Sequence, residues 1–213
     1  MENLPKIVVG VPYHTKKQYC LLKLEKTLKS LSYSNKEILL RFDPNEYGSQ
    51  NSVKKQREWF RNYTLNSGAD YLMFIGADTL PPADVLERLL KVAEANRIKI
   101  IGGVYWGRHG ADNGNTGNAV AWIHEMSQEE QSGLFKQPNS LVKVDGMGMD
   151  MVLIHREVLE KINWLDYPQN DDDYPIYDKI KGLGYDIYID TSLQAKHYFS
   201  ETGYSYLGKK YVE

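Results

Sequence analysis

The sequence predicts an α/β fold in which a mostly parallel central sheet has helices on both faces. One observation behind this prediction is that short apolar runs rich in β-branched residues alternate with segments whose apolar residues recur at helical spacing, the pattern of successive βαβ units. Another is composition, because 42% of the 213 residues are apolar and 25% are charged, as in ordinary globular domains. We expect one domain over residues 1–213, with a regular first half at about 1–104 and a less regular second half at about 105–213.

Four apolar runs in the first half predict strands, because each is short, continuous and followed by turn-forming or polar residues. These runs cover residues 6–11, 37–42, 71–75 and 99–104. Pro12 is expected to end the first of them. Helices are expected between the strands wherever apolar residues recur at helical spacing. They cover residues 21–31, about 52–65, and a segment that begins near Pro81 and Pro82 and continues to about Val92.

The second half of the chain differs in character. Residues 102–117 are rich in Gly, Asn and Asp, and the apolar runs 141–144 and 151–154 flank a glycine-rich bend. A further helix is indicated over about 176–183, and Gly184 is expected to end it. We interpret this half as a substrate-facing elaboration of the same domain.

Charge and hydropathy exclude some classes of protein. The 26 basic residues nearly balance the 28 acidic ones, so the formal net charge of -2 creates no field that would gather nucleic acid or anionic lipid. No apolar run approaches the roughly 20 residues that span a bilayer, and the N-terminus shows no signal-peptide pattern. We therefore expect a cytoplasmic protein with no transmembrane segment and no nucleic-acid partner. The single cysteine, Cys20, is expected to pack in the core.

Polar residues follow the expected strands at the position where parallel α/β sheets bind ligands. Such ligands lie beyond the carboxyl ends of the strands, so the loops that carry His14, Asp43 and Asp78 are expected to share one crevice. Asp78 is the most informative of these residues, because a carboxylate at a strand end can help to hold a hard cation and a diphosphate. The alternative is that Asp78 or Thr79 simply caps the helix that begins near Pro81.

Two familiar phosphate-binding loops are missing from the sequence. There is no G-x-x-x-x-G-K-[ST] motif, and no G-x-G-x-x-G motif follows a strand. This absence weighs against P-loop ATPases and dinucleotide-dependent dehydrogenases. The phosphates of a bound nucleotide would instead be neutralised by a metal ion and isolated side chains.

Several residues of the second half have both a functional and a structural interpretation. One of the adjacent carboxylates Asp171–Asp173 could serve as a general base, or the three could form the solvated N-terminus of a helix. Glycines within 145–150 allow the close approach of either a ligand or another strand. His197 could be a ligand or a structural histidine. Trp106 could stack on a sugar or a nucleobase, or it could pack in the core.

Taken in order, four passages resemble glycosyltransferase family 2-like enzymes of the GT-A fold. They are KIVVGVPYHT, GADYLMFIGADTLPPADVLERLL, VDGMGMDMVLIHREVLEKI, and DDDYPIYDKIKGLGYDIYID with the AKHYFS that follows it. Each passage is a weak signal, but their order and spacing make the resemblance fairly specific over roughly residues 5–200. The resemblance implies a single GT-A domain, with a nucleotide-sugar-binding half at about 1–104 and an acceptor-side half at about 105–213.

The resemblance also implies which residues contact the donor. Pro12 and Tyr13 match the end of the family's first strand, which lies against the nucleotide base. Asp43 matches an acidic residue after the second strand that contacts the base. Arg57 falls near a basic residue in the helix before the metal-binding strand. Asp78 matches the family's metal ligand, and the diphosphate of the donor would be bridged to that metal.

The metal motif of the family is usually D-x-D at the end of the central strand. This chain has Gly76-Ala77-Asp78 at that point, so only the final aspartate, the family's metal ligand, is retained. A histidine beyond the last strand can complete the metal site in this fold, and His197 with Ser200 resembles that H-x-x-S stretch. The resemblance therefore implies Mn²⁺ or Mg²⁺ bound by Asp78 and His197.

On the acceptor side, the resemblance points to an acidic pair and a glycine-rich loop. Asp172 resembles the first residue of the family's acidic pair, and Asp173 resembles the catalytic base. Asp145 and Gly146 belong to the passage that resembles the loop beneath the donor sugar and the acceptor. Trp106 is placed with them as an aromatic face for the acceptor or the sugar.

By resemblance, the protein is expected to move a sugar from a UDP- or GDP-linked donor to the hydroxyl of an unidentified acceptor. Asp173 would take the proton of that hydroxyl as its oxygen attacks the anomeric carbon, which inverts the anomeric configuration. Two alternatives stay open. A nucleotidyltransferase of similar fold would attack phosphorus instead. A catalytically weak or inactive nucleotide- or sugar-binding module would be consistent with the absence of a carboxylate at Gly76.

Overall fold

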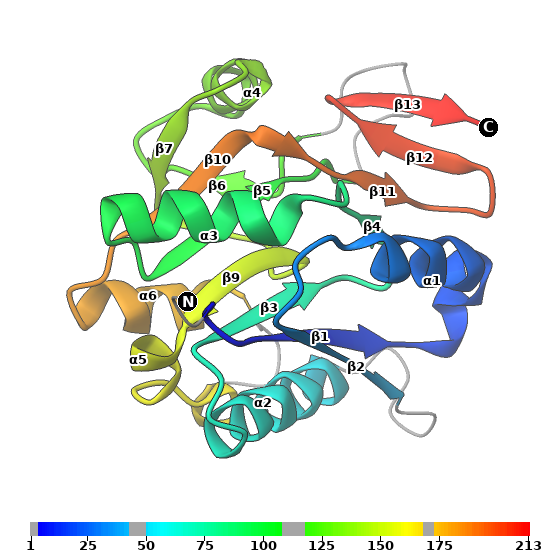
Figure 1. Ribbon diagram of the computed structural model, residues 1–213. Coiled ribbons are helices and arrows are strands. Elements are labelled where there is room, and N and C mark those ends of the chain that lie inside the picture. The colour runs from blue at the N-terminus through cyan, green and yellow to red at the C-terminus, as the bar shows by residue number, and fades with distance from the viewer. Residues whose placement is uncertain (1–3, 43–49, 108–117, 168–172) are drawn as a thin grey trace.

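The computed structural model describes residues 4–42, 50–107, 118–167 and 173–213 and contains a seven-stranded central sheet (Figure 1). The strands of this sheet are β1 (Ile7–Tyr13), β2 (Lys36–Phe42), β3 (Tyr71–Ile75), β5 (Ile100–Val104), β7 (Leu141–Val144), β9 (Met151–His155) and β10 (Ile187–Gln194). Their order across the sheet is β2-β1-β3-β9-β5-β10-β7. The expected strands at 6–11, 37–42, 71–75 and 99–104 are therefore confirmed, with small changes in their bounds.

The α/β class is confirmed, but the sheet is mixed. β1 pairs in parallel with β2 and β3, and β10 pairs in parallel with β5. β9 lies antiparallel between β3 and β5, and β7 is antiparallel to β10. The prediction of a mostly parallel sheet did not account for β9. β7 and β9 thus run in the direction opposite to that of the other five strands, and no local pattern within residues 151–155 records this direction.

Helices cover both faces of the sheet, as the alternating pattern predicts (Figure 1). They are α1 (Leu21–Ser30), α2 (Gln50–Asn66), α3 (Val85–Asn96), α4 (Gln128–Lys136), α5 (Arg156–Leu159) and α6 (Tyr174–Gly182). The core cluster on one face takes its helical residues from α1 and α3. The cluster on the other face takes them mainly from α2, α5 and α6, and it includes Phe60 and Ile176. Because β1, β3, β5 and β9 are buried on both faces, these strands are continuous apolar runs.

One strand boundary differs from the prediction. Pro12 does not end β1, which continues to Tyr13. β3 pairs with β1 only as far as Gly10, whereas β2 pairs with it as far as Tyr13. Pro12 therefore lies where the strand has a partner on one side only, and its missing N–H leaves no gap in the ladder.

Two smaller sheets, which the sequence did not predict, complete the fold. β4 (Thr79–Leu80), β11 (Lys196–Tyr198), β12 (Gly203–Tyr206) and β13 (Lys209–Val212) form one of them, in the order β13-β12-β11-β4. β6 (Ala121–Trp122) and β8 (Gly146–Met147) form the other. Short 3₁₀ helices lie at Thr15–Cys20 and Trp164–Asp166. Within the described ranges, no helix is both long enough and apolar enough to cross a membrane.

Candidate functional site

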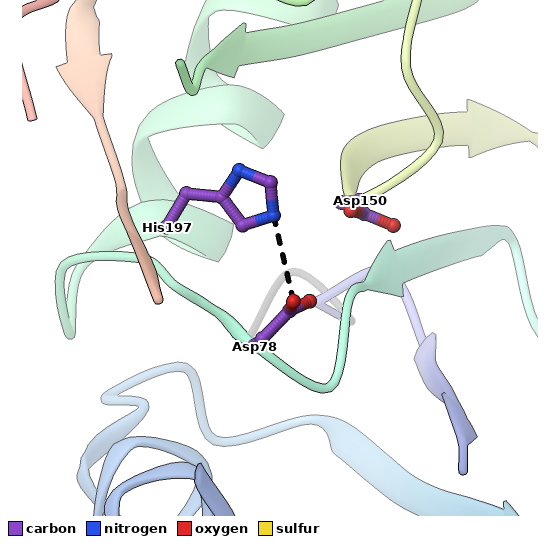
Figure 2. A group of neighbouring side chains, drawn as sticks. All are labelled: Asp78, Asp150 and His197. Carbon is purple, nitrogen blue, oxygen red and sulfur yellow. Dashed lines mark ion pairs between the residues drawn. The ribbon is translucent and has the colours of Figure 1, made fainter. Parts of the chain in front are cut away.

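Three side chains of metal-binding type converge beyond the carboxyl end of β3 (Figure 2). Asp78 lies in the turn between β3 and β4, Asp150 directly precedes β9, and His197 lies on β11. One possible ligand atom from each residue can be chosen so that all three atoms lie within 4.8 Å of one another. We call Asp78, Asp150 and His197 the acidic-histidine group.

Strand pairing brings the members of this group together. Ile75 of β3 lies opposite Met151 of β9, and the next backbone contact is a hydrogen bond from the Gly76 N–H to the Asp150 carbonyl at 2.9 Å. Across the small sheet, Thr79 of β4 lies opposite His197 of β11. Asp78 therefore lies between the residues that anchor the other two members. These pairings join segments that are far apart in the sequence.

Burial makes the charge of Asp78 costly unless a cation is close. The residue is 1% exposed, and a buried carboxylate requires a positive partner or several hydrogen bonds. Lys17, from the 3₁₀ helix after β1, forms an ion pair with Asp78. The Tyr19 hydroxyl donates a hydrogen bond to the same carboxylate oxygen at 3.4 Å. The loops after β1 and β3 thus meet, as the expected crevice at the strand ends requires.

The orientation of the His197 ring favours a cation between it and Asp78. Its Nδ1 atom lies 2.8 Å from the carbonyl oxygen of Trp106. Because a carbonyl can only accept a hydrogen bond, Nδ1 must carry a proton. A neutral ring then directs the lone pair of Nε2 toward the Asp78 carboxylate, 3.5 Å away. That contact is favourable only when a proton or a metal ion lies between the two groups, and a backbone partner at Nδ1 is common for metal-binding histidines.

A second charged pair lies nearby. Arg57 of α2 contacts the carboxylate of Asp173, directly before α6, at 2.6 Å. The buried Tyr105 hydroxyl connects this pair electrostatically with the acidic-histidine group. Burial raises the pKa of Tyr105 well above its usual value, and the negative charges of Asp150 and Asp173 raise it further. The Tyr105 ring packs edge-on against the His197 ring, with the centroids 5.3 Å apart, so the hydroxyl on which Asp173 acts belongs to a residue beside the acidic-histidine group.

The residues predicted to contact the nucleotide base differ in their exposure, and one of them lies outside the described residues. Tyr13 is 8% exposed and packs against Phe42, with the ring centroids 5.7 Å apart. Its buried hydroxyl has no hydrogen-bond partner among the residues that the structure describes. Pro12, next to it, is partly exposed. Asp43 lies outside the described residues, as does Asp172 of the expected acidic pair.

The structure corrects the predicted role of Trp106. Its side chain is fully buried, and its indole N–H donates to Oε1 of Gln194 at 2.9 Å. A fully buried ring cannot stack on a ligand, so the prediction of an aromatic face for a sugar or acceptor is wrong. Trp106 contributes to the site through its carbonyl oxygen, which contacts His197.

Asp145 and Gly146 lie beside a different pocket. Asp145 accepts a hydrogen bond from the backbone N–H of His124 at 2.8 Å and forms an ion pair with Lys181. These three residues line a pocket of about 560 Å³ whose lining does not include the acidic-histidine group. Gly146 packs directly against the Trp122 ring. Asp145 and Gly146 were predicted to lie beneath the donor sugar. The structure places them at this pocket, and not at the acidic-histidine group.

Sequence reasoning did not identify Asp150, Lys17, Tyr19 or Tyr105 as site residues. Asp150 was recognised only as the end of a glycine-rich bend. The available signal was a polar residue directly before a continuous apolar strand, the same signal that identified Asp78 directly after one. A parallel strand would have placed Asp150 at the end of the sheet opposite to Asp78, so only the antiparallel direction of β9 brings the two residues together.

No family model matches the chain, and no curated protein matches it. A solved structure described as the crystal structure of A197 from STIV is similar to this fold, with a TM-score of 0.69 and 17% sequence identity. The match covers 98% of this chain and 94% of that one. At this level of identity, the similarity shows a shared fold. The chain is therefore an α/β protein with a mixed central sheet and an acidic-histidine group beyond the carboxyl end of β3.

Proposed function

We propose that this protein is a glycosyltransferase that moves a sugar from a UDP- or GDP-linked donor to an acceptor hydroxyl, with Mn²⁺ or Mg²⁺ at the acidic-histidine group. One observation carries the proposal: three side chains that could hold a cation lie beside Tyr105, whose hydroxyl also feels the charge of Asp173, a carboxylate suited to be a base. The order of the sequence motifs supports it. The comparison with A197 contributes the fold alone.

The ligand set suits a divalent cation that holds a diphosphate. Asp78 and Asp150 offer two negative charges and His197 offers a neutral nitrogen, a set that Mn²⁺ accepts readily, whereas Mg²⁺ prefers oxygen ligands alone. A cation bound there would offset the charge that develops on the leaving diphosphate. Lys17 forms an ion pair with Asp78. A cation that replaced Lys17 at this carboxylate would leave the Lys17 ammonium available to the phosphate oxygens.

Asp173 is the residue proposed to take the proton from the acceptor. It lies directly before α6 with a side chain that is 28% exposed, so it is accessible to a hydroxyl from solvent. Arg57 is 6% exposed beside it and favours its ionised form, which is the form that a general base needs. Attack of the deprotonated oxygen on the anomeric carbon in one step would invert the anomeric configuration.

A donor-turnover assay tests this proposal. The full chain is incubated with labelled UDP- and GDP-sugars and Mn²⁺, with a panel of acceptors, and the released nucleotide is identified. Release of a nucleoside diphosphate together with sugar transfer supports the proposal. Release of pyrophosphate would instead indicate a nucleotidyltransferase, and donor binding without turnover would indicate a binding module.

Three variants assign the roles. Asp173→Asn should abolish transfer while donor binding survives, because the proposed base does not hold the donor. Asp78→Asn should weaken the Mn²⁺-dependent binding of the nucleotide itself. Asp178→Asn is the matched control, because Asp178 is an exposed carboxylate on α6, the helix that begins directly after the proposed base. Wild-type transfer by Asp173→Asn would remove the base assignment.

A further inference from the structure

Gly76 and Asp150 face each other across β3 and β9, just beyond the last paired residues. The Gly76 N–H donates to the Asp150 carbonyl at 2.9 Å, which continues the register of Ile75 opposite Met151. Side chains of directly opposed residues on antiparallel strands lie on the same face of the sheet. A side chain at position 76 would therefore extend from the same face as that of Asp150.

No such side chain fits at position 76. A Cβ atom placed on Gly76 would lie 2.4 Å from Cγ of Asp150 and 2.7 Å from its Oδ1, much closer than side-chain atoms approach one another. Gly76 is not among the glycines with a positive φ, so the backbone at this position does not require a glycine. The requirement is space, and the carboxyl group of Asp150 fills that space.

The carboxylate of Asp150 lies where a cation beside Asp78 would contact both residues. A carboxylate oxygen of Asp150 lies within 4.8 Å of one from Asp78, and two carboxylates at that separation repel each other. The Thr79 hydroxyl donates a hydrogen bond to the Asp150 carboxylate at 3.4 Å. Nε2 of His197 lies 3.5 Å from the Asp78 carboxylate, so a proton or a metal ion in the same space would be stabilised by both groups.

We propose that Asp150 is a direct ligand of the cation and that Gly76 is required to admit it. A carboxylate at position 76 and one at position 150 would then be alternative ways to fill the same space. Besides Asp78, the second acidic ligand of the cation then comes from the residue before the neighbouring antiparallel strand, and not from the position two residues before Asp78. The ligand role of Asp150 rests on the proposed function, because it requires a cation at this site. The steric coupling of positions 76 and 150 does not depend on a cation.

A reciprocal exchange of the two residues tests the ligand role. Asp150→Asn keeps the size of the side chain and removes its charge, so Mn²⁺ affinity should fall at least about tenfold. The double variant Gly76→Asp/Asp150→Gly places the carboxylate on the opposite strand in the vacated space, and it should regain most of that affinity. The matched control is Gly76→Asn/Asp150→Gly, which has the same shape without the charge and should not regain it. Mn²⁺ binding is measured by calorimetry on the full chain without nucleotide.

Thermal melting tests the steric coupling without any metal. Gly76→Ala should lower the melting temperature, because its Cβ meets the Asp150 carboxyl. The same substitution in an Asp150→Gly background should have a much smaller effect, since the space is then empty. Equal effects in the two backgrounds would overturn the coupling, and this readout remains decisive if the exchange variant does not fold.

The outcomes separate this inference from the proposed function. If wild-type protein binds Mn²⁺ and Asp150→Asn binds it equally well, Asp150 is not a ligand, while the glycosyltransferase proposal stands. If the exchange variant folds but gains no affinity over its Asn control, the inference is likewise overturned. If wild-type protein binds no Mn²⁺ with or without a nucleoside diphosphate, both the ligand role and the metal-dependent function fail.

Discussion

The guanidinium of Arg57 lies 2.6 Å from the carboxylate of Asp173, so a buried residue of α2 holds the residue directly before α6. Arg57 is the less exposed partner, at 6% against 28% for Asp173. The two residues are 116 positions apart in the sequence. The pair therefore fixes the start of α6, and with it the proposed base, relative to the central sheet.

Removal of Asp173 should destabilise the fold, because it leaves the buried guanidinium of Arg57 without this counter-ion. We expect Asp173→Ala to lower the free energy of unfolding by about 2 kcal/mol, less than for a fully buried pair because Asp173 is partly exposed to solvent. Arg57→Met in the same chain should restore part of this loss. Urea denaturation measures both, with the exposed Asp178→Ala as control. A loss equal to that of the control would show that the pair contributes nothing.

Lys17 should compete with the cation for Asp78, since it forms an ion pair with that carboxylate. Without nucleotide, Lys17→Met is expected to bind Mn²⁺ roughly tenfold more tightly, the equivalent of one charge-assisted hydrogen bond of about 1.5 kcal/mol. Saturating Mn²⁺ should also raise the melting temperature of the variant more than that of the wild type. Calorimetry measures the affinity, and Lys26→Met, an exposed change on α1, is the control. Weaker binding by Lys17→Met would contradict the competition.

Alanine substitutions at two glycines should change the free energy of unfolding in opposite directions. A Cβ on Gly10 of β1 would lie 2.8 Å from the ring of the fully buried Phe60, so Gly10→Ala should cost about 1–3 kcal/mol of stability. Gly133 lies within α4 with no heavy atom within 4 Å of its expected Cβ, so Gly133→Ala should stabilise the protein by about 0.5–1 kcal/mol. Urea denaturation tests both changes, and a neutral effect of Gly10→Ala would argue against the packing of α2 on β1.

Glu157 should make the stability dependent on pH in the acid range. The pKa of Glu157 is lowered from its usual 4.5 to about 2. The largest cause is a hydrogen bond from the Tyr185 hydroxyl, and the next is a hydrogen bond from Lys99. Because the pKa is lowered on folding, this stabilisation is present above about pH 4.5 and is lost as the pH falls toward 2. The difference in melting temperature between wild type and Glu157→Gln should therefore shrink over that range. The exposed Glu25→Gln is the control, and a difference that does not change with pH would refute the assignment.

The candidate site was only partly predictable from the sequence. Asp78 and His197 were predicted as metal ligands, and the structure brings them together, although metal binding itself stays a prediction. Asp150 was missed, because its place beside Asp78 depends on β9 running antiparallel to β3. Trp106 was misinterpreted, because an aromatic residue directly after a strand has the same local pattern whether its ring is exposed or buried.

What the sequence determined by itself is local. The alternation of apolar runs and helical periodicity specifies where the regular strands and helices of the first half lie, because burial of one face or of both imposes a period on neighbouring residues. Tertiary structure alone decided the direction of β9 and the pairing of β4 with β11. Those pairings place Asp78, Asp150 and His197 around one point, and no periodicity within a segment records which strand lies next to it.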